Sequence, residues 1–135
     1  DLIGKLNGML DMVDHIEQES PKLVQQYREK LEAKVQELLD GSNIDESRIA
    51  AEVVIYADKI CVDEETVRLR SHINSTKEIL SGGGSVGRKL DFIAQEMNRE
   101  ANTILSKANS LDISNTAIDL KTEIEKVREQ IQNIE

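Results

Sequence analysis

Apolar side chains recur along the chain at alternating steps of three and four residues, the spacing that places them on one face of a helix. The pattern starts almost at the first residue and is interrupted at Ser20-Pro21. Proline is tolerated in the first turn of a helix and disfavours helical geometry in the residue before it. We therefore expect a first helix to end near Ser20 and a second to run from Pro21 to the turn residues 40–43. The apolar positions of the first helix are Leu2, Leu6, Met9, Val13 and Ile16.

The middle of the chain predicts two more helices. Residues 49–60 carry the apolar stripe of a third helix, with Asn43 or Asp45 as its N-cap. Residues 62–65, with the sequence VDEE, are a short junction into a fourth helix, because acidic residues in a first turn complement the helix dipole. That helix reaches residues 81–86, SGGGSV, whose composition predicts a flexible linker.

The last third of the chain predicts a fifth and a sixth helix. The fifth starts near Gly87 and has small residues on its apolar stripe, which allow a neighbouring helix to approach closely. The sixth follows Asp112 and carries an uninterrupted four-three alternation over residues 113–134, the seam of a coiled coil. Its partner is either the first helix or another subunit, and spacing leaves both open. We predict an all-α fold, one domain over residues 1–135, built as an elongated bundle of helical hairpins with a coiled-coil-like C-terminal helix.

Composition narrows the classes of function. The chain is 39% hydrophobic and 32% charged, which suits a folded domain, but its aromatic fraction of 2% leaves few platforms for stacking bases. A net charge of -9 has the wrong sign for holding nucleic acid through the average field, so any RNA contact must be local. The glycine run at 82–84 lacks the Lys-Ser or Lys-Thr ending of a phosphate-binding loop, and the two histidines, His15 and His72, indicate no hydrolase triad.

Cellular context is read from the cysteine content and from targeting patterns. Cys61 is the only cysteine, which excludes an internal disulfide and is compatible with a reducing compartment. The sequence has no signal-peptide pattern and no apolar run of the roughly 20 residues that a membrane helix needs. We expect a cytoplasmic protein without a membrane partner. Because the chain begins at Asp1, already inside a periodic apolar pattern, we expect an N-terminal domain of the same protein to precede it.

One predicted helical face carries groups suited to phosphodiester cleavage. Glu64, Arg68 and His72 are spaced by four residues and line one face of the fourth helix. Carboxylates beside an imidazole bind a divalent metal or share acid-base work. The alternative is a solvated stripe, in which Glu64 and Glu65 pair with Arg68 and His72 is a polar surface residue.

The fifth helix has a second stripe, made of short polar side chains. Asparagine is a poor helix former, so this stripe indicates a use for its amides. They either hydrogen-bond across a helix interface or face a ligand such as a ribose-phosphate backbone, and the sequence leaves both open. The same segment is locally basic through Arg88, Lys89, Arg99 and Lys107. The stripe consists of Asp91, Gln95, Asn98, Asn102 and Ser106.

A long run of this helix closely resembles a known family. Residues 87–103 read GRKLDFIAQEMNREANT and are followed by Ser106-Lys107, a pattern similar to the signature of the YicC-like endoribonucleases. Residues 127–135, VREQIQNIE, look like the C-terminus of the same family. The resemblance extends over residues 20–135. Earlier positions that fit the family pattern are Glu52, Val53, Asp63, Glu64, Glu65, Arg68, Leu69, Ser71 and His72.

The resemblance implies the C-terminal half of a divalent-metal-dependent endoribonuclease, a hydrolase that acts on RNA in the bacterial cytoplasm as a homo-oligomer. The implied metal is Mn²⁺ or Mg²⁺. Carried over by position, the carboxylates expected to hold the metal are Glu52, Asp63, Glu64 and Glu65. The residues expected to be catalytic are His72, Glu96 and Asp91. The residues expected to bind RNA or its phosphates are Arg68, Arg88, Lys89, Asn98, Arg99, Asn102 and Lys107.

Two other functions stay open at this point. The first is a helical oligomerisation and RNA-binding scaffold without its own catalytic site, which self-associates through the seam of the sixth helix. The second is a monomeric bundle that presents adaptor surfaces, which suits the acidic charge but gives the amide stripe no use. If surfaces of the N-terminal domain build the RNA channel, we expect this chain alone to be folded and inactive.

Overall fold

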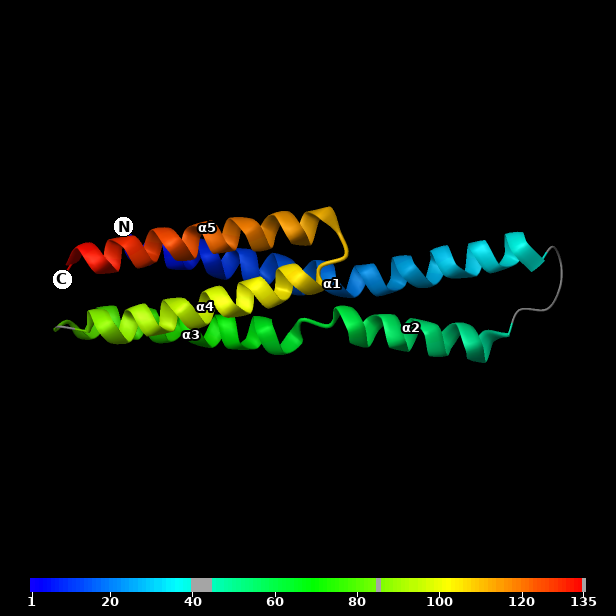
Figure 1. Cartoon of the computed structure of the whole chain (residues 1–135), viewed down its shortest axis with the longest axis horizontal. Helices are drawn as coiled ribbons and strands as arrows, with labels where there is room; N and C mark the ends of the chain where they lie inside the picture. The colour runs from blue at the N-terminus through cyan, green and yellow to red at the C-terminus, as the bar shows by residue number, and fades with distance from the viewer. Residues whose placement is uncertain (40–44, 85, 135) are drawn as a thin grey trace.

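The structure, a computed structural model, describes residues 1–39, 45–84 and 86–134. These residues form helices and connecting turns and contain no strand, so the all-α prediction is confirmed. The molecule is elongated, and its two termini lie at the same end (Figure 1). The helices in chain order are α1 (Leu2–Leu39), α2 (Glu46–Ile60), α3 (Asp63–Gly82), α4 (Gly87–Lys107) and α5 (Leu111–Ile134).

Helix α1 is continuous through its proline, so the prediction of two helices divided at Ser20-Pro21 is wrong. Packing holds the helix on both sides of this dipeptide. Before it, Val13 and Ile16 are fully buried; after it, Tyr27 stacks on Tyr56 of α2. Helical structure in proteins is stabilised mainly by such packing, which here outweighs the local preference of proline. The end predicted for the second helix, at residues 40–43, lies outside the described residues.

The first half of α1 packs with α3, α4 and α5 as a four-helix bundle (Figure 1). Its core is aliphatic, with methionine in place of aromatic residues. Ala94 and Ala101 of α4 and Ala117 of α5 are fully buried, and their small side chains let these two helices approach closely. The largest fully buried side chains of the bundle are Leu6, Met9, Ile16, Leu69, Ile73, Met97, Ile104, Leu120, Ile124 and Ile131.

The heptad seam of α5 is covered by helices of the same chain. Helix α5 packs against α4 and α1, so the first helix is one of its two partners. Because the seam lies in the core of the bundle, it does not form a surface for another subunit. The buried seam positions, each at most 3% exposed, are Ile113, Ala117, Leu120, Ile124, Val127 and Ile131.

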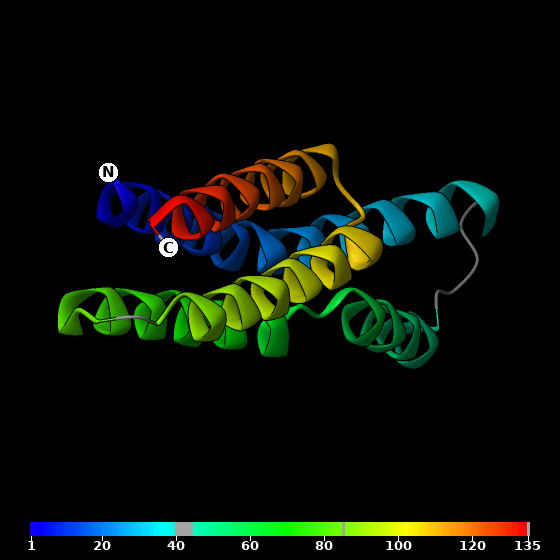
Figure 2. The same ribbon diagram turned by 60° about the vertical axis from the view of Figure 1, so that its left-hand side comes forward.

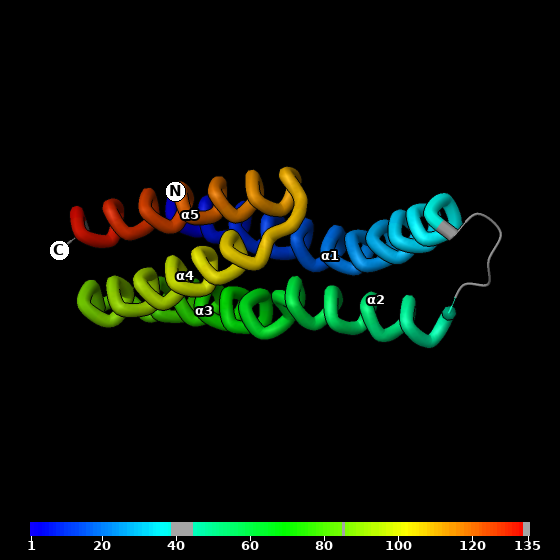
Figure 3. The backbone as a smooth tube through the Cα atoms, turned by 45° about the vertical axis from the view of Figure 1, so that its right-hand side comes forward, coloured from blue at the N-terminus to red at the C-terminus, as the bar shows by residue number. Residues whose placement is uncertain are grey.

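The second half of α1 and helix α2 form a hairpin that extends beyond the bundle, which we call the arm (Figures 2 and 3). Its buried side chains are few: Ile49, Val53 and Ile60 of α2 face α1. The rings of Tyr27 and Tyr56 stack with centroids 3.9 Å apart and planes 3° from parallel. The arm therefore has a small packing unit of its own, connected to the bundle by the unbroken α1.

The N-cap of α2 is Asp45, one of the two residues predicted for it. Its carboxylate accepts a hydrogen bond from the backbone N–H of Arg48 at 3.3 Å, which satisfies one of the free donors of the first turn. The other predicted cap, Asn43, lies outside the described residues.

The connection between α3 and α4 is shorter than the predicted linker of residues 81–86, because Ser81 and Gly82 still belong to α3. Gly83 and Gly84 follow with φ of 71° and 87°, a region that side chains other than glycine rarely adopt. The two glycines thus reverse the chain and allow α4 to start at Gly87, as predicted. Ser85 lies outside the described residues.

Candidate nucleic-acid interface

An ionic network joins the start of α3 to the end of α4. Arg68 donates from Nε to Oε2 of Glu100 at 2.6 Å, and its Nη2 lies 3.6 Å from Oε2 of Glu65. Lys107 places Nζ 3.2 Å from the same Glu65 oxygen and donates to the carbonyl of Cys61 at 3.0 Å. Glu65 and Glu100 are buried, with 4% and 7% of their surface exposed. Each buried carboxylate is therefore neutralised by a cation.

Helical spacing and chain reversal assemble this network. Glu65 and Arg68 lie one turn apart on α3, while Glu100 and Lys107 lie two turns apart on α4. Because α3 and α4 are antiparallel, the first turns of one meet the last turns of the other. The hydrogen bond with Glu100 raises the pKa of Arg68 above its ordinary range, and the nearby carboxylates of Glu65 and Glu64 raise this pKa further. The guanidinium is thus permanently charged and fixed in place.

Two of the three predicted catalytic residues lie beside this network. His72 follows Arg68 by one turn of α3, and Glu96 precedes Glu100 by one turn of α4, so both lie on the helix faces that carry the network. Both are half-buried. Within the described part of the chain, neither side chain has a hydrogen-bond or ion-pair partner. An imidazole and a carboxylate therefore lie one helical turn beyond the network, on α3 and on α4.

The third predicted catalytic residue, Asp91, lies on the other side of α4. Its Oδ1 accepts a hydrogen bond from Nε of Arg128 of α5 at 2.7 Å, and its Oδ2 accepts one from Gln95 at 3.1 Å. The hydrogen bond from Arg128 is the main cause that holds the pKa of Asp91 below its ordinary range. Asp91 is thus placed to join α4 to α5 rather than to act together with His72 and Glu96.

The solvent-facing side of α4 carries three of the seven predicted RNA-binding residues, Arg88, Arg99 and Asn102. We call it the outer stripe: six positions at alternating steps of four and three, all of them exposed. The aromatic member, Phe92, is 62% exposed. The amide stripe of the sequence is therefore divided, since Asp91 faces α5 and Asn98 is half-buried, whereas the remaining members face solvent. The outer stripe consists of Arg88, Phe92, Gln95, Arg99, Asn102 and Ser106.

The predicted phosphate-binding cations fall into two groups. Arg68 and Lys107 are engaged by Glu100 and Glu65. Arg88, Lys89 and Arg99 are exposed, and no carboxylate of the described residues pairs with them. The second group is the one able to meet a phosphate without losing an existing partner.

A groove between the arm and the end of α4 contains residues that the sequence did not single out. It has a volume of about 410 Å³ and is lined in part by Lys59, Ser106 and Lys107. Tyr56 also lines it, and its hydroxyl oxygen accepts a hydrogen bond from Nδ2 of Asn109 at 2.5 Å. The groove combines two cations with an aromatic ring beside the outer stripe. No spacing rule predicts it, because α2 and α4 meet here only through the tertiary fold.

The four predicted metal-binding carboxylates do not form one site. Glu52 is exposed on α2, and Asp63 and Glu64 are exposed in the first turn of α3, while Glu65 is engaged by Lys107. Among the described residues, the one group of three potential ligands is formed instead by His15, Glu19 and Asp112. The four carboxylates therefore do not fit a shared metal ion in this arrangement. The i, i+4 spacing of His15 and Glu19 was visible in the sequence, but the distant Asp112 was not.

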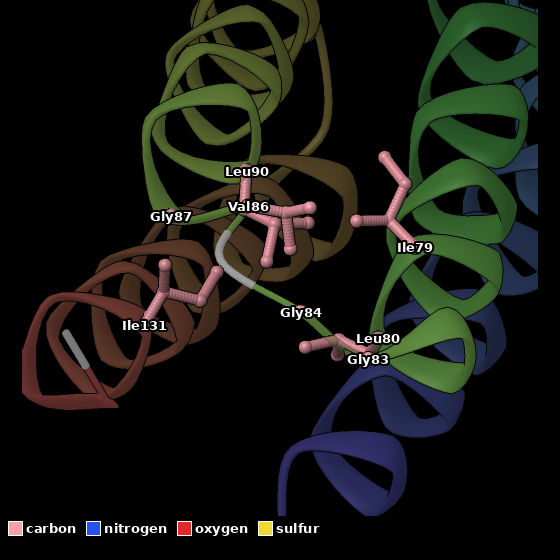
Figure 4. A pocket seen from close by; sticks show the side chains of 8 residues that line it. All are labelled: Ile79, Leu80, Gly83, Gly84, Val86, Gly87, Leu90 and Ile131. Carbon is pink, nitrogen blue, oxygen red and sulfur yellow. The ribbon is translucent and has the colours of Figure 1, made fainter.

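A cavity at the α3–α4 turn is a poor candidate for catalysis. It has a volume of about 210 Å³ and opens beside Gly83 and Gly84 (Figure 4). Its other lining side chains are aliphatic, and the described lining residues include no titratable group. The lining residues are Ile79, Leu80, Gly83, Gly84, Val86, Gly87, Leu90 and Ile131.

None of the helices formed by the described residues combines the length and apolar character of a membrane span.

Residues 16–135 match the family described as endoribonuclease YicC-like, C-terminal. The chain is 48% identical over 136 residues to a probable endoribonuclease YicC of Clostridioides difficile, covering 100% of this chain and 46% of the relative. It is 42% identical over 132 residues to a probable endoribonuclease YicC of Haemophilus influenzae, covering 97% and 45%. The chain thus spans about half the length of the curated relatives it matches.

Proposed function

This chain belongs to the YicC-like endoribonuclease family, and we propose that it is the helical part of a cytoplasmic, divalent-metal-dependent enzyme that cleaves RNA phosphodiester bonds. The observation that carries the proposal is the ionic network between α3 and α4, with the polar residues that lie beside it. His72 lies one turn from Arg68 on α3, and Glu96 lies one turn from Glu100 on α4. The outer stripe lies on the solvent side of α4. Acid-base groups and exposed cations are thus combined on one surface.

RNA docking is assigned to the cations that have no carboxylate partner. The net charge of -9 repels a polyanion, so affinity depends on local positive groups rather than on the average field. Arg88 and Arg99 lie three turns apart on the outer stripe, with Phe92 between them as a ring on which a base can stack. Lys59 extends this surface towards the groove beside the arm. A single RNA strand that follows the outer stripe would contact both the two arginine side chains and the ring of Phe92.

Proton transfer is assigned to His72 and Glu96. Imidazole is the side chain most suited to gaining and losing a proton near neutral pH, and the carboxylate on α4 supplies the complementary acid or base. Arg68 keeps its contact with Glu100 and thereby holds α3 and α4 together beside these two groups. A divalent cation would supply charge neutralisation and activation of water when bound. The carboxylates predicted to hold such an ion, Glu52, Asp63, Glu64 and Glu65, do not fit one shared ion in this arrangement.

Cleavage of a labelled single-stranded RNA tests the proposal. The chain and a version extended to the full length of its relatives are compared with Mn²⁺, with Mg²⁺ and with chelator. We expect metal-dependent cutting by the extended protein, and a loss of at least about a hundredfold in rate for His72→Gln and for Glu96→Gln. Glu78→Gln, at an exposed carboxylate of α3, serves as the matched control. Unchanged rates of RNA cleavage for both His72→Gln and Glu96→Gln would contradict the assignment of proton transfer to these residues.

RNA binding is tested separately by fluorescence anisotropy over a series of salt concentrations. Replacing Arg88 and Arg99 with glutamine should weaken binding and lower the salt slope by about 0.7 for each phosphate that is no longer neutralised. Arg70→Gln is the matched control, because Arg70 is engaged by Asp14 and Glu17 at 2.6 Å each. Equal effects of the outer-stripe and control variants would contradict the assignment of the docking surface.

A second candidate function is a helical RNA-binding scaffold without its own catalytic site. The specific observation in its favour is that the buried carboxylates Glu65 and Glu100 are already neutralised by Lys107 and Arg68. Self-association of such a scaffold would use surfaces other than the α5 seam, which is buried inside the chain. RNA binding without cutting by the extended protein, with a multimeric mass in light scattering, would favour the scaffold over the nuclease.

A further inference from the structure

We propose that the chain binds a first-row transition-metal dication at His15, Glu19 and Asp112, where α1 meets the start of α5. The site was not among the metal candidates of the sequence, and it does not depend on nuclease activity. Its ligands come from two helices, and His15 and Asp112 are separated by 97 positions in the chain. An ion bound there would fasten α5 to α1 at the end of the bundle next to the arm.

The distances between the ligand atoms suit a small cation. Nε2 of His15 lies 2.8 Å from Oδ2 of Asp112, and one oxygen of Glu19 completes a group in which all three atoms lie within 4.8 Å of one another. Ligands around a tetrahedral ion at about 2.0–2.2 Å are themselves about 3.5 Å apart. His15 and Asp112 therefore need to separate slightly and Glu19 to approach, which side-chain rotations provide.

The backbone at His15 and at Asp112 is held by the bundle. Val13 and Ile16 are fully buried on either side of His15, so this turn of α1 is fixed in the core. Asp112 precedes the buried Ile113 in the first turn of α5, and Ser110 caps that turn by accepting a hydrogen bond from the N–H of Ile113 at 3.1 Å. Ligands whose backbone is fixed in this way lose little freedom on binding an ion.

The donor set indicates the class of ion. One imidazole nitrogen and two carboxylate oxygens suit Zn²⁺, Mn²⁺ and related ions, whereas Mg²⁺ and Ca²⁺ prefer oxygen alone. The side chains of His15 and Asp112 are 40% and 58% exposed, which leaves the remaining coordination positions to water. The nearest competing cation is Lys22, whose Nζ lies 3.2 Å from Glu19. Lys22 is 62% exposed, and such a surface pair contributes little, so a dication displaces it readily.

The histidine content makes this site directly observable. The chain has two histidines, His15 in the proposed site and His72 on α3. In imidazole NMR spectra of the full chain, paramagnetic Mn²⁺ at substoichiometric amounts should broaden the His15 signals and leave those of His72 sharp. Broadening of His72 ahead of His15, or of neither residue, would overturn the proposal.

Calorimetric titration of the chelator-treated chain with Zn²⁺ and with Mn²⁺ gives the affinity. His15→Gln and Asp112→Asn should each weaken binding at least about tenfold, as loss of a ligand or its support does at protein metal sites. The matched controls are His72→Gln and Asp119→Asn, an exposed aspartate of the same helix. Retained affinity in both site variants, or equal losses in the controls, would overturn the assignment. RNA cleavage is not part of either readout, so failure of the nuclease proposal leaves this one to be judged by itself.

Discussion

Replacing Lys107 with methionine separates a structural role of this residue from the phosphate-binding role expected from the sequence. Methionine keeps an unbranched apolar stem of similar length and removes the ammonium group. The substitution removes two interactions: the ion pair with Glu65 at 3.2 Å and the hydrogen bond to the carbonyl of Cys61 at 3.0 Å. The Glu65 carboxylate, with 5% of its side chain exposed, then depends on Arg68, whose Nη2 lies 3.6 Å away. We expect the folded state to be destabilised.

The magnitude follows from these interactions. A hydrogen bond to a charged group contributes about 1.5–3 kcal/mol, and removing one partner of a buried pair costs about 3–5 kcal/mol. The side chain of Lys107 is 35% exposed, so solvent screens part of the loss. We therefore expect the free energy of unfolding to fall by about 2 kcal/mol, which corresponds to a drop of about 6–10 °C in melting temperature for a domain of this size.

Urea unfolding followed by far-ultraviolet circular dichroism measures this loss. Lys126→Met is the matched control, because Lys126 is 53% exposed and lies 3.4 Å from Glu123, and its loss should be below about 0.5 kcal/mol. In a Glu65→Gln background the effect of Lys107→Met should shrink, since no buried carboxylate is left unpaired. Equal losses for the two lysine variants, or the same loss in both backgrounds, would refute the structural role.

Three further outcomes are expected. Pro21→Ala should raise the free energy of unfolding by about 2 kcal/mol in the same urea assay, because alanine restores the missing donor inside α1, and a lower stability would contradict a continuous helix. Tyrosine fluorescence, which reports only on Tyr27 and Tyr56 of the arm, should show a lower urea midpoint than circular dichroism, whereas coincident midpoints would mean that arm and bundle unfold together. Asp91→Asn should lower the free energy of unfolding at about pH 6 and lower it progressively less below about pH 4. A carboxyl whose pKa is lowered by folding stabilises the protein above its unfolded pKa. That contribution is lost as the pH falls through the folded pKa. A difference between the Asp91 variant and the unchanged chain that does not vary with pH would contradict this.

The helices were largely predictable because each carries its own periodic signal. The four-three spacing and the turn residues located α2 to α5, including the start of α4 at Gly87 and the cap at Asp45. The failure at Ser20-Pro21 has a physical cause. Proline acts locally, whereas α1 is held by the bundle before it and by α2 after it, and spacing along one segment contains no information on either. For the same reason the sequence could not choose between an internal and an external partner for the α5 seam.

The candidate site was predictable only as far as one helix face extends. Glu64, Arg68 and His72 share a face of α3, and the alternative of pairing with the adjacent carboxylates is confirmed for Arg68. The hydrogen bond to Glu100 crosses 32 positions and has no counterpart in local spacing. Asp91 was named as a catalytic candidate by its position in the family motif, and it lies on another side of α4 from Glu96, in contact with Arg128. A helix turns by about 100° per residue, so one continuous motif supplies three different surfaces.

The distribution of ion pairs decides which cations of this acidic chain are available for the proposed RNA binding. Arg68, Arg70, Lys107 and Arg128 each have carboxylate partners, and a phosphate would have to displace those partners before gaining anything. Among the described residues, no carboxylate pairs with the two cations of the outer stripe, Arg88 and Arg99, so a phosphate would displace no partner there. An arginine that is already paired contributes to the position of its helix, while an exposed arginine without a partner contributes to binding through counterion release. Formal net charge alone argues against RNA binding, whereas the exposed cations on one face of α4 support the docking surface proposed there.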